Sequence, residues 1–181
     1  MSSNHPSQPK AHAPIDTAAI RIAAQNLDEG AVTSGYRGNR QEIIDMLNGA
    51  LATELVCIMR YKRHYFTVTG RENLAVKAEF LQHAQEEGGH ADQIAERIVQ
   101  LNGYPDFDPA TLTGRSHAEY DDSSDVQSMV RANLIAERVA IESYRQMIEK
   151  IGDTDPTTRQ MLVGIMAVEE QHADDMRDFL S

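Results

Sequence analysis

The residues of this sequence best suited to chemistry are four glutamates and two histidines, spread over four amphipathic segments. Each segment places one glutamate on its apolar face, and the second and fourth segments add a histidine three residues after that glutamate. Because residues i and i+3 lie on the same face of a helix, each histidine can approach the same point as its glutamate. The six residues are Glu54, Glu87, His90, Glu137, Glu169 and His172.

Glutamates on the apolar face of a helix need a partner. A buried carboxylate without one takes up a proton or binds a cation. A single Glu-x-x-His is typical of a solvated helix face, but two copies together with two further glutamates on apolar faces indicate a shared metal. Oxygen-rich ligands with one imidazole per metal favour iron or manganese over structural zinc. Four carboxylates neutralise two divalent ions, and this is the donor set of di-iron carboxylate bundles.

Four long helices must bring these residues together. Apolar residues repeat at steps of three and four from residue 40 to Gly70, over 72–102, over 125–151 and over 155–180. The segment 103–124 is too long for a helix–helix turn and can run the length of a helix. The predicted fold is therefore all-α, a four-helix bundle with one long crossover between its second and third helices.

The predicted bundle spans residues 40–181, and residues 1–39 form an N-terminal extension. The first 14 residues are polar without an apolar period, so they are expected to be mobile. Asp16 is a candidate N-cap for a short helix over residues 15–29. Packing of this helix between subunits is the favoured role of the extension.

Composition narrows the class of protein. The chain has 181 residues, with 28 acidic and 17 basic side chains and a formal net charge of −11. This charge does not favour nucleic acids or anionic membranes as partners, and no apolar run approaches the ~20 residues of a membrane span. Cys57 is the single cysteine, which excludes an intramolecular disulfide and a zinc site made only of cysteines. With no apolar leader at the N-terminus, a soluble cytoplasmic protein is predicted.

The sequence resembles the bacterioferritin branch of the ferritin-like superfamily over residues 45–180. The motifs that carry the resemblance are ATEL around Glu54, EGGH from Glu87 to His90, LNGYP after the second helix, AERVAIESY around Glu137, and VEEQH from Val168 to His172. Together they form a specific pattern. The resemblance implies an intrasubunit di-iron site, with manganese or zinc as substitutes for iron.

The resemblance also implies a role for each residue. One iron would be held by Glu54 and His90, and the other by Glu137 and His172. Glu87 and Glu169 would bridge the two. Tyr61 matches a tyrosine that such proteins keep beside the metals, where it would bond a bridging glutamate or supply an electron; a packed core tyrosine is the alternative interpretation.

Two departures from the bacterioferritin pattern matter. Gly88 occupies the position of the methionine that binds haem, so haem is not expected. The sequence stops just after the fourth helix, at Ser181, without the usual short fifth helix. In this it is similar to Dps-type mini-ferritins, which form 12-subunit shells. A homo-oligomeric cage is therefore predicted, with 12 subunits favoured over 24.

The predicted function is a ferroxidase that oxidises Fe(II) with O2 or H2O2, for iron storage or detoxification inside the cage. The predicted catalytic residues are the six metal ligands and Tyr61. Two alternatives remain. One is another di-metal oxidoreductase on the same bundle, namely a peroxidase, a manganese catalase or an oxygenase. The other is a Dps-like shell that protects DNA. Residues 1–40 carry a net charge of only +1, so strong DNA binding through this arm is not expected.

Several polar residues receive no metal role from the sequence. Glu86 and Glu170 neighbour the predicted ligands and are expected to point elsewhere. His64 and His83 lack a partner pattern. Cys57 is expected to be a small buried side chain.

Overall fold

The computed structural model describes residues 15–28 and 30–181, and the predicted polar tail lies outside them. The chain divides into two units, Met1–Gly35 and Tyr36–Ser181. The second unit holds four long helices: α2 (Arg40–Thr67), α3 (Leu74–Gln100), α5 (Val126–Ile151) and α6 (Pro156–Asp178).

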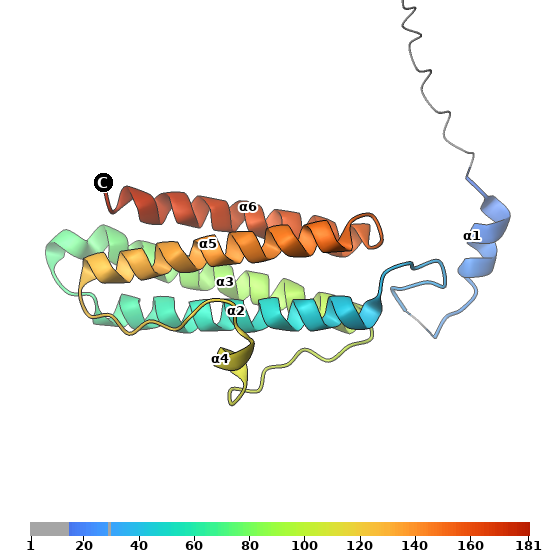
Figure 1. Ribbon diagram of the computed structural model, residues 1–181, viewed down its shortest axis with the longest axis horizontal. Helices are drawn as coiled ribbons and strands as arrows, with labels where there is room; N and C mark the ends of the chain where they lie inside the picture. Colours follow the sequence, from blue (N-terminus) through green and yellow to red (C-terminus); the bar gives the residue numbers. More distant parts are fainter. Residues whose placement is uncertain (1–14, 29) are drawn as a thin grey trace, which may run out of the picture. The chain divides into compact units, whose positions relative to one another are not determined.

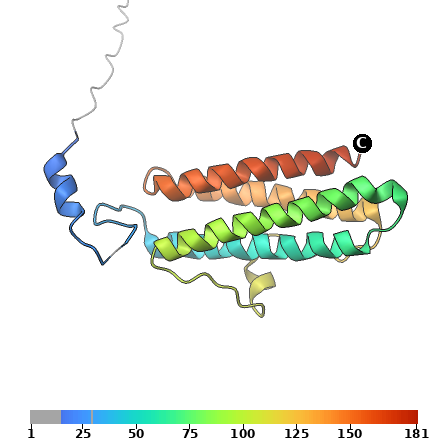
Figure 2. The same ribbon diagram turned by 180° about the vertical axis from the view of Figure 1, so that it is seen from behind.

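The four long helices form two antiparallel hairpins packed side by side (Figures 1 and 2). Helix α2 packs along α3, and α5 packs along α6; α2 also contacts α5, and α3 contacts α6. Every regular element in the described residues is helical. The predicted all-α bundle is confirmed.

Local sequence signals set the helix ends. The Asn39 side chain accepts a hydrogen bond from the Glu42 backbone N–H and so caps α2. Gly70 adopts φ +97° after α2, a conformation open to glycine, and the short 3-10 helix η1 (Arg71–Asn73) leads into α3. Asp125 and Asp155 cap α5 and α6 by accepting from Ser128 and Thr158.

The predicted long crossover is present and joins the end of α3 to the start of α5, which makes these two helices parallel (Figure 1). It contains the short helix α4 (Leu112–Arg115), which packs on α2. Arg115 donates to the backbone oxygen of Asn48 at 3.1 Å, and the His117 N–H donates to Thr53 Oγ1 at 2.9 Å. These bonds hold the crossover against α2.

The helix in the N-terminal extension is shorter than the predicted 15–29. Helix α1 covers Thr17–Ala23, and Asp16 caps it by accepting from two backbone N–H groups. Beyond α1, the Asn26 side chain accepts from the Asp28 N–H at 3.2 Å, a local turn that competes with helix continuation. None of the α1 residues is buried, so no packing extends the helix.

The bundle core has three layers along its length. Apolar residues fill one end, among them Leu47, Leu51, Ile94, Ile98 and Leu162. A second apolar cluster fills the other end and includes Tyr61, Phe80, Met129, Val130 and Met176. Between them is a middle layer of buried glutamates and histidines. In the part of the chain that the structure describes, no helix is both long and apolar enough to cross a membrane.

Candidate metal centre

The six residues singled out from the sequence meet in the middle layer. Each of the four long helices contributes one glutamate, and α3 and α6 contribute the histidines. Every one of the six side chains belongs to a residue that is at most 5 % exposed. Their donor atoms form two clusters, and within each cluster the atoms lie within 4.8 Å of one another.

The first cluster is centred on His90. Its Nδ1 lies 2.8 Å from Glu169 Oε1, 3.1 Å from Glu87 Oε2 and 3.5 Å from Glu54 Oε2. One imidazole nitrogen and three carboxylates therefore converge on a single point.

The second cluster is centred on His172. Its Nδ1 lies 3.3 Å from Glu169 Oε2, 3.7 Å from Glu87 Oε1 and 3.9 Å from Glu137 Oε2. Glu87 and Glu169 thus belong to both clusters, with a different oxygen turned to each. This is the geometry of two bridging carboxylates between two cations.

Many of these buried donor atoms have no hydrogen-bond partner in the described structure. They are Glu54 Oε2, Glu87 Oε1, Glu137 Oε2, both oxygens of Glu169, and His172 Nδ1. A buried polar atom without a partner costs ~1–3 kcal/mol, and more when it is charged. Two divalent ions, one at the centre of each cluster, would be bound by these atoms and would satisfy them. The residues therefore fit the metal pair expected from the sequence.

Protons replace cations as the counter-charge when no metal is bound. Burial, with the nearby charge of Glu87, raises the pKa of Glu54 to about 8. The pKa of Glu137 is raised well above its usual value for the same two reasons. Burial opposes charging of His90, but the nearby carboxylates of Glu169, Glu54 and Glu87 raise its pKa to about 12. Burial opposes charging of His172 as well, and Glu169 and Glu87 raise its pKa to about 11.

Two tyrosines orient the outermost carboxylates. The Tyr61 hydroxyl donates to Glu137 Oε1, and the Tyr144 hydroxyl donates to Glu54 Oε1. Tyr61 therefore lies beside the clusters as expected, but its partner is a glutamate of one cluster rather than a bridging one. Sequence reasoning assigned no role to Tyr144, although it lies seven residues after Glu137 on the same helix face.

His83 and Glu86 were also missed. His83 is fully buried, its Nδ1 lies 3.0 Å from the Tyr61 oxygen, and its ring stacks on His172 with centroids 3.9 Å apart. Its place three residues after Phe80 and four before Glu87 puts it on the inward face, which is the signal that could have found it. Glu86 does not point away from the centre, because its Oε2 lies 2.7 Å from His172 Nε2.

Cys57 is buried in the bundle. Burial raises the pKa of its thiol, and Arg60 donates a hydrogen bond to its sulfur at 3.3 Å. The expectation of a small buried side chain is confirmed. Arg60 also donates to Asn133 at 2.8 Å, which fixes α2 against α5.

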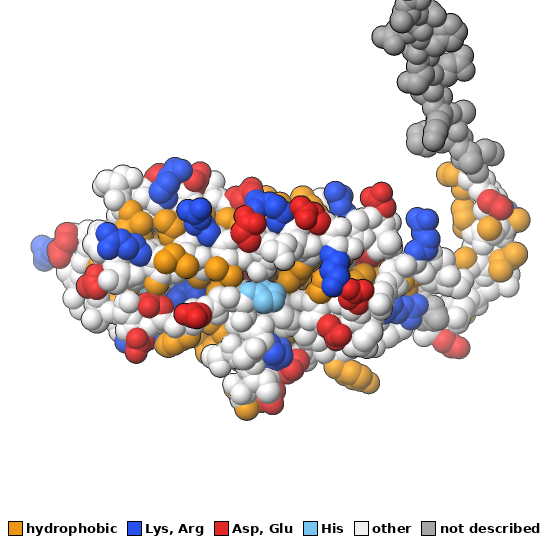
Figure 3. Space-filling model, viewed as in Figure 1, with side chains coloured by type: hydrophobic (Ala, Val, Ile, Leu, Met, Phe, Trp, Pro, Cys, Tyr) orange, Lys and Arg blue, Asp and Glu red, His pale blue; other side chains and the backbone are white. Residues whose placement is uncertain are grey.

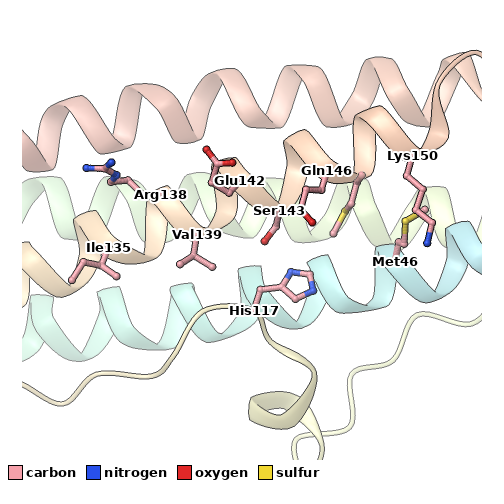
Figure 4. Close-up of a pocket in the computed structure, with 10 residues that line it drawn as sticks. Met46, His117, Ile135, Arg138, Val139, Glu142, Ser143, Gln146 and Lys150 are labelled. Atoms are coloured by element: carbon pink, nitrogen blue, oxygen red, sulfur yellow. The ribbon is translucent and has the colours of Figure 1, made fainter.

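A groove of about 800 Å³ lies on another face, between α2, α5 and the crossover (Figure 4). His117, Glu142, Ile135 and Val139 are among the residues that line it. Among the described residues, the groups of three or more potential metal ligands all lie outside this groove. The candidate chemistry therefore lies in the middle layer of the bundle and not in this groove.

A four-helix bundle with one long crossover and paired carboxylate–histidine clusters is a ferritin-like architecture. Residues 44–181 match the family model of the ferritin-like domain, and the chain belongs to this family.

The chain is also similar to individual proteins of known name. A bacterioferritin-related protein of Bacteroides fragilis, described as a dodecameric thioferritin, superposes with a TM-score of 0.76 at 34% identity, over 80% of this chain and 87% of that one. The nutrient stress-induced DNA-binding protein of a Synechococcus strain is 29% identical over 77% of this chain and 81% of its own length. The bacterioferritin of Brucella melitensis is 29% identical over 74% and 79%.

Proposed function

We propose that the protein is a ferroxidase, which oxidises pairs of Fe(II) ions with H2O2 or O2 and holds the product in a homo-oligomeric cage. The observation that carries this proposal is the pair of buried clusters that share Glu87 and Glu169. Each of these two carboxylates has one oxygen near His90 and the other near His172. Membership of the ferritin-like family supports it.

Each Fe(II) substrate has a defined set of ligands in this proposal. One is held by Glu54 and His90, and the other by Glu137 and His172. Glu87 and Glu169 bridge them. Two Fe(II) ions then bring four positive charges to four carboxylates, and hard oxygen donors stabilise the Fe(III) product more than the Fe(II) substrate.

The proposed oxidation of two Fe(II) ions balances in electrons and in protons. Each Fe(II) gives one electron, so a pair reduces one H2O2 to two waters, or one O2 to H2O2, and either reaction consumes two protons. Iron binding displaces protons from groups with raised pKa values, such as Glu54 and His90, close to where the oxidant is reduced. The Tyr61 hydroxyl keeps the Glu137 carboxylate in place, and the Tyr144 hydroxyl does the same for Glu54.

The test is stopped-flow oxidation of Fe(II) by H2O2 and by O2, followed by the absorbance of Fe(III). Replacing both bridging ligands in a Glu87→Gln/Glu169→Gln variant should reduce the rate to that of Fe(II) in buffer, because the remaining donors cannot hold two ions together. Glu170→Gln is the matched control, since Glu170 neighbours Glu169 but is exposed. Rapid oxidation by the double variant would overturn the assignment.

The cage is proposed from the relatives. The Bacteroides fragilis protein, which is 34% identical to this chain, is described as dodecameric. Twelve subunits are therefore the proposed assembly.

A DNA-protecting shell is the second candidate, because one relative is named a DNA-binding protein. The charge pattern favours it less. Acidic and basic side chains are interspersed over the face of the bundle in Figure 3, which shows no continuous basic stripe.

A further inference from the structure

His83 has a fixed hydrogen-bonding state that the paired clusters do not explain. The Tyr61 hydroxyl gives its hydrogen to Glu137, so its oxygen can only accept from His83 Nδ1, 3.0 Å away. The proton of the neutral imidazole is therefore on Nδ1. The other nitrogen, Nε2, carries a lone pair.

This lone pair faces two carboxylates. Nε2 lies 3.2 Å from Glu79 Oε1 and 3.6 Å from Asp175 Oδ2. It is buried, and neither carboxylate meets hydrogen-bond geometry with it. A nitrogen lone pair beside two carboxylate oxygens is repulsive unless a cation lies among them.

The three side chains have the arrangement of a mononuclear metal site. Their donor atoms lie within 4.8 Å of one another, and Gln171 donates to Asp175 Oδ1 at 2.8 Å, which leaves Oδ2 turned to His83. His83 is fully buried, whereas the side chains of Glu79 and Asp175 are 25 % and 31 % exposed. A hydrated ion can therefore reach the carboxylates from solvent and be fixed by the imidazole.

We propose that Glu79, His83 and Asp175, the His83 triad, bind one divalent transition-metal ion outside the paired clusters. Two carboxylates cancel its charge, and one imidazole with two carboxylate oxygens selects Fe(II), Mn(II), Co(II) or Zn(II) over Mg(II). The His83 ring stacks on His172, and Tyr61 links it to Glu137. If the proposed ferroxidase function holds, this site holds Fe(II) on its way into the paired clusters.

The test counts bound ions with Co(II), whose d–d absorption reports coordination, in anaerobic titrations of the full-length protein. The parent should bind three Co(II) per subunit, and Glu79→Gln/Asp175→Asn should bind two. Asp174→Asn is the matched control, because Asp174 neighbours Asp175 on α6 but its side chain is 62 % exposed and pairs with Arg177. It should bind three.

A second variant separates this proposal from the ferroxidase proposal. Glu87→Gln/Glu169→Gln disables the paired clusters and should leave one Co(II), which disappears when Glu79→Gln/Asp175→Asn is added. That result supports the His83 triad whether or not the paired clusters oxidise iron. An unchanged number of ions in Glu79→Gln/Asp175→Asn would overturn the proposal, as would anomalous scattering from a Co(II)-soaked crystal with no peak between the three side chains.

Discussion

At the residue scale, two tyrosine hydroxyls act on the carboxylates at opposite ends of the paired clusters. Burial and the neighbouring charge of Glu137 raise the pKa of Tyr61 well above its usual value, so the phenol keeps its proton and acts as a donor. Burial and Glu54 do the same for Tyr144. Each hydroxyl therefore fixes a carboxylate of the clusters without adding negative charge to them.

Removing one hydroxyl should slow iron oxidation without unfolding the bundle. Tyr61→Phe frees Glu137 and leaves His83 Nδ1 without its acceptor, so the rate should fall about 10- to 100-fold, the usual effect of losing a partner of a metal ligand. Stopped-flow oxidation measures this rate. Tyr65→Phe is the control on the same helix and should match the parent. A parental rate for Tyr61→Phe would mean that Tyr61 is only a packed core residue.

The same clusters predict how stability depends on pH. His90 and His172 have pKa values of about 12 and 11 in the folded protein, above the ~6.5 of an unfolded chain, and Glu54 has about 8 against ~4.5. The folded state therefore binds more protons than the unfolded state between pH 7 and 9. Raised pKa values give stability at lower pH that is lost as the pH rises.

We therefore expect the metal-free protein to lose stability steadily from pH 7 to pH 9, as the protons that these groups hold in the folded state are lost. Urea unfolding in the presence of a chelator measures the change. Loaded with Zn(II), the protein should lose this trend or reverse it, because the metal then supplies the counter-charge. A metal-free protein whose stability rises with pH over this range would contradict the protonation of the clusters.

The six residues of the paired clusters lie together as the sequence predicted, because each obeys a local rule: a polar side chain at an apolar position of one helix. His83, Glu86 and Tyr144 were missed because their roles depend on what the neighbouring helices present. The Glu86 side chain meets His172 only through the packing of α3 against α6. Such contacts follow from helix rotation and cannot be obtained from the periodicity of one helix.

At the element scale, a buried polar network joins the segment before α2, the end of α3 and the start of α6. Arg97 Nη2 donates to both oxygens of Asp155 at 3.0 and 3.1 Å, and Tyr36 donates to Asp155 at 2.8 Å. The same carboxylate caps α6 by accepting from the Thr158 N–H at 2.9 Å. Asp155 is 1 % exposed, so one side chain serves as both ion-pair partner and helix cap.

Asp155→Ala should therefore destabilise the protein strongly. It removes the carboxylate that compensates the charge of the buried Arg97 guanidinium, which costs about 3–5 kcal/mol with the loss of the cap included. Urea unfolding of the metal-free protein at pH 7 measures this cost. Asp153→Ala, two residues earlier and exposed, should stay within about 0.5 kcal/mol of the parent. A loss below 1 kcal/mol for Asp155→Ala would show that the network does not hold α3 to α6.

The ends of the four long helices follow from caps and glycines in the sequence, and they agree with the predicted limits to within a few residues. The N-terminal helix differs more, because nothing in the described structure buries its apolar residues. Ile20 and Ile22 are 54 % and 73 % exposed. A capped apolar segment without a packing partner gives a short helix, and the sequence alone does not show whether a partner exists.

At the scale of the whole molecule, the negative charge belongs to the bundle. Residues 1–40 carry a net charge of +1, which leaves −12 for residues 41–181. Six of the carboxylates in this part belong to the paired clusters and the His83 triad. The charge of the molecule therefore favours cations as its partners.

Assembly separates the ferroxidase cage from the other di-metal oxidoreductases on the same bundle. A peroxidase, manganese catalase or oxygenase turns over at its metals and needs no store, whereas a cage encloses a volume in which oxidised iron accumulates.

We expect light scattering to give a mass close to twelve chains of 20.2 kDa. After aerobic Fe(II) loading and gel filtration, the same species should retain far more iron than the three ions per subunit proposed for the paired clusters and the His83 triad. In the Glu87→Gln/Glu169→Gln variant the shell should still form, but iron should precipitate outside it. A dimer, or a shell that retains only two or three irons per subunit, would favour an enzyme that uses the di-metal centre as a resident cofactor.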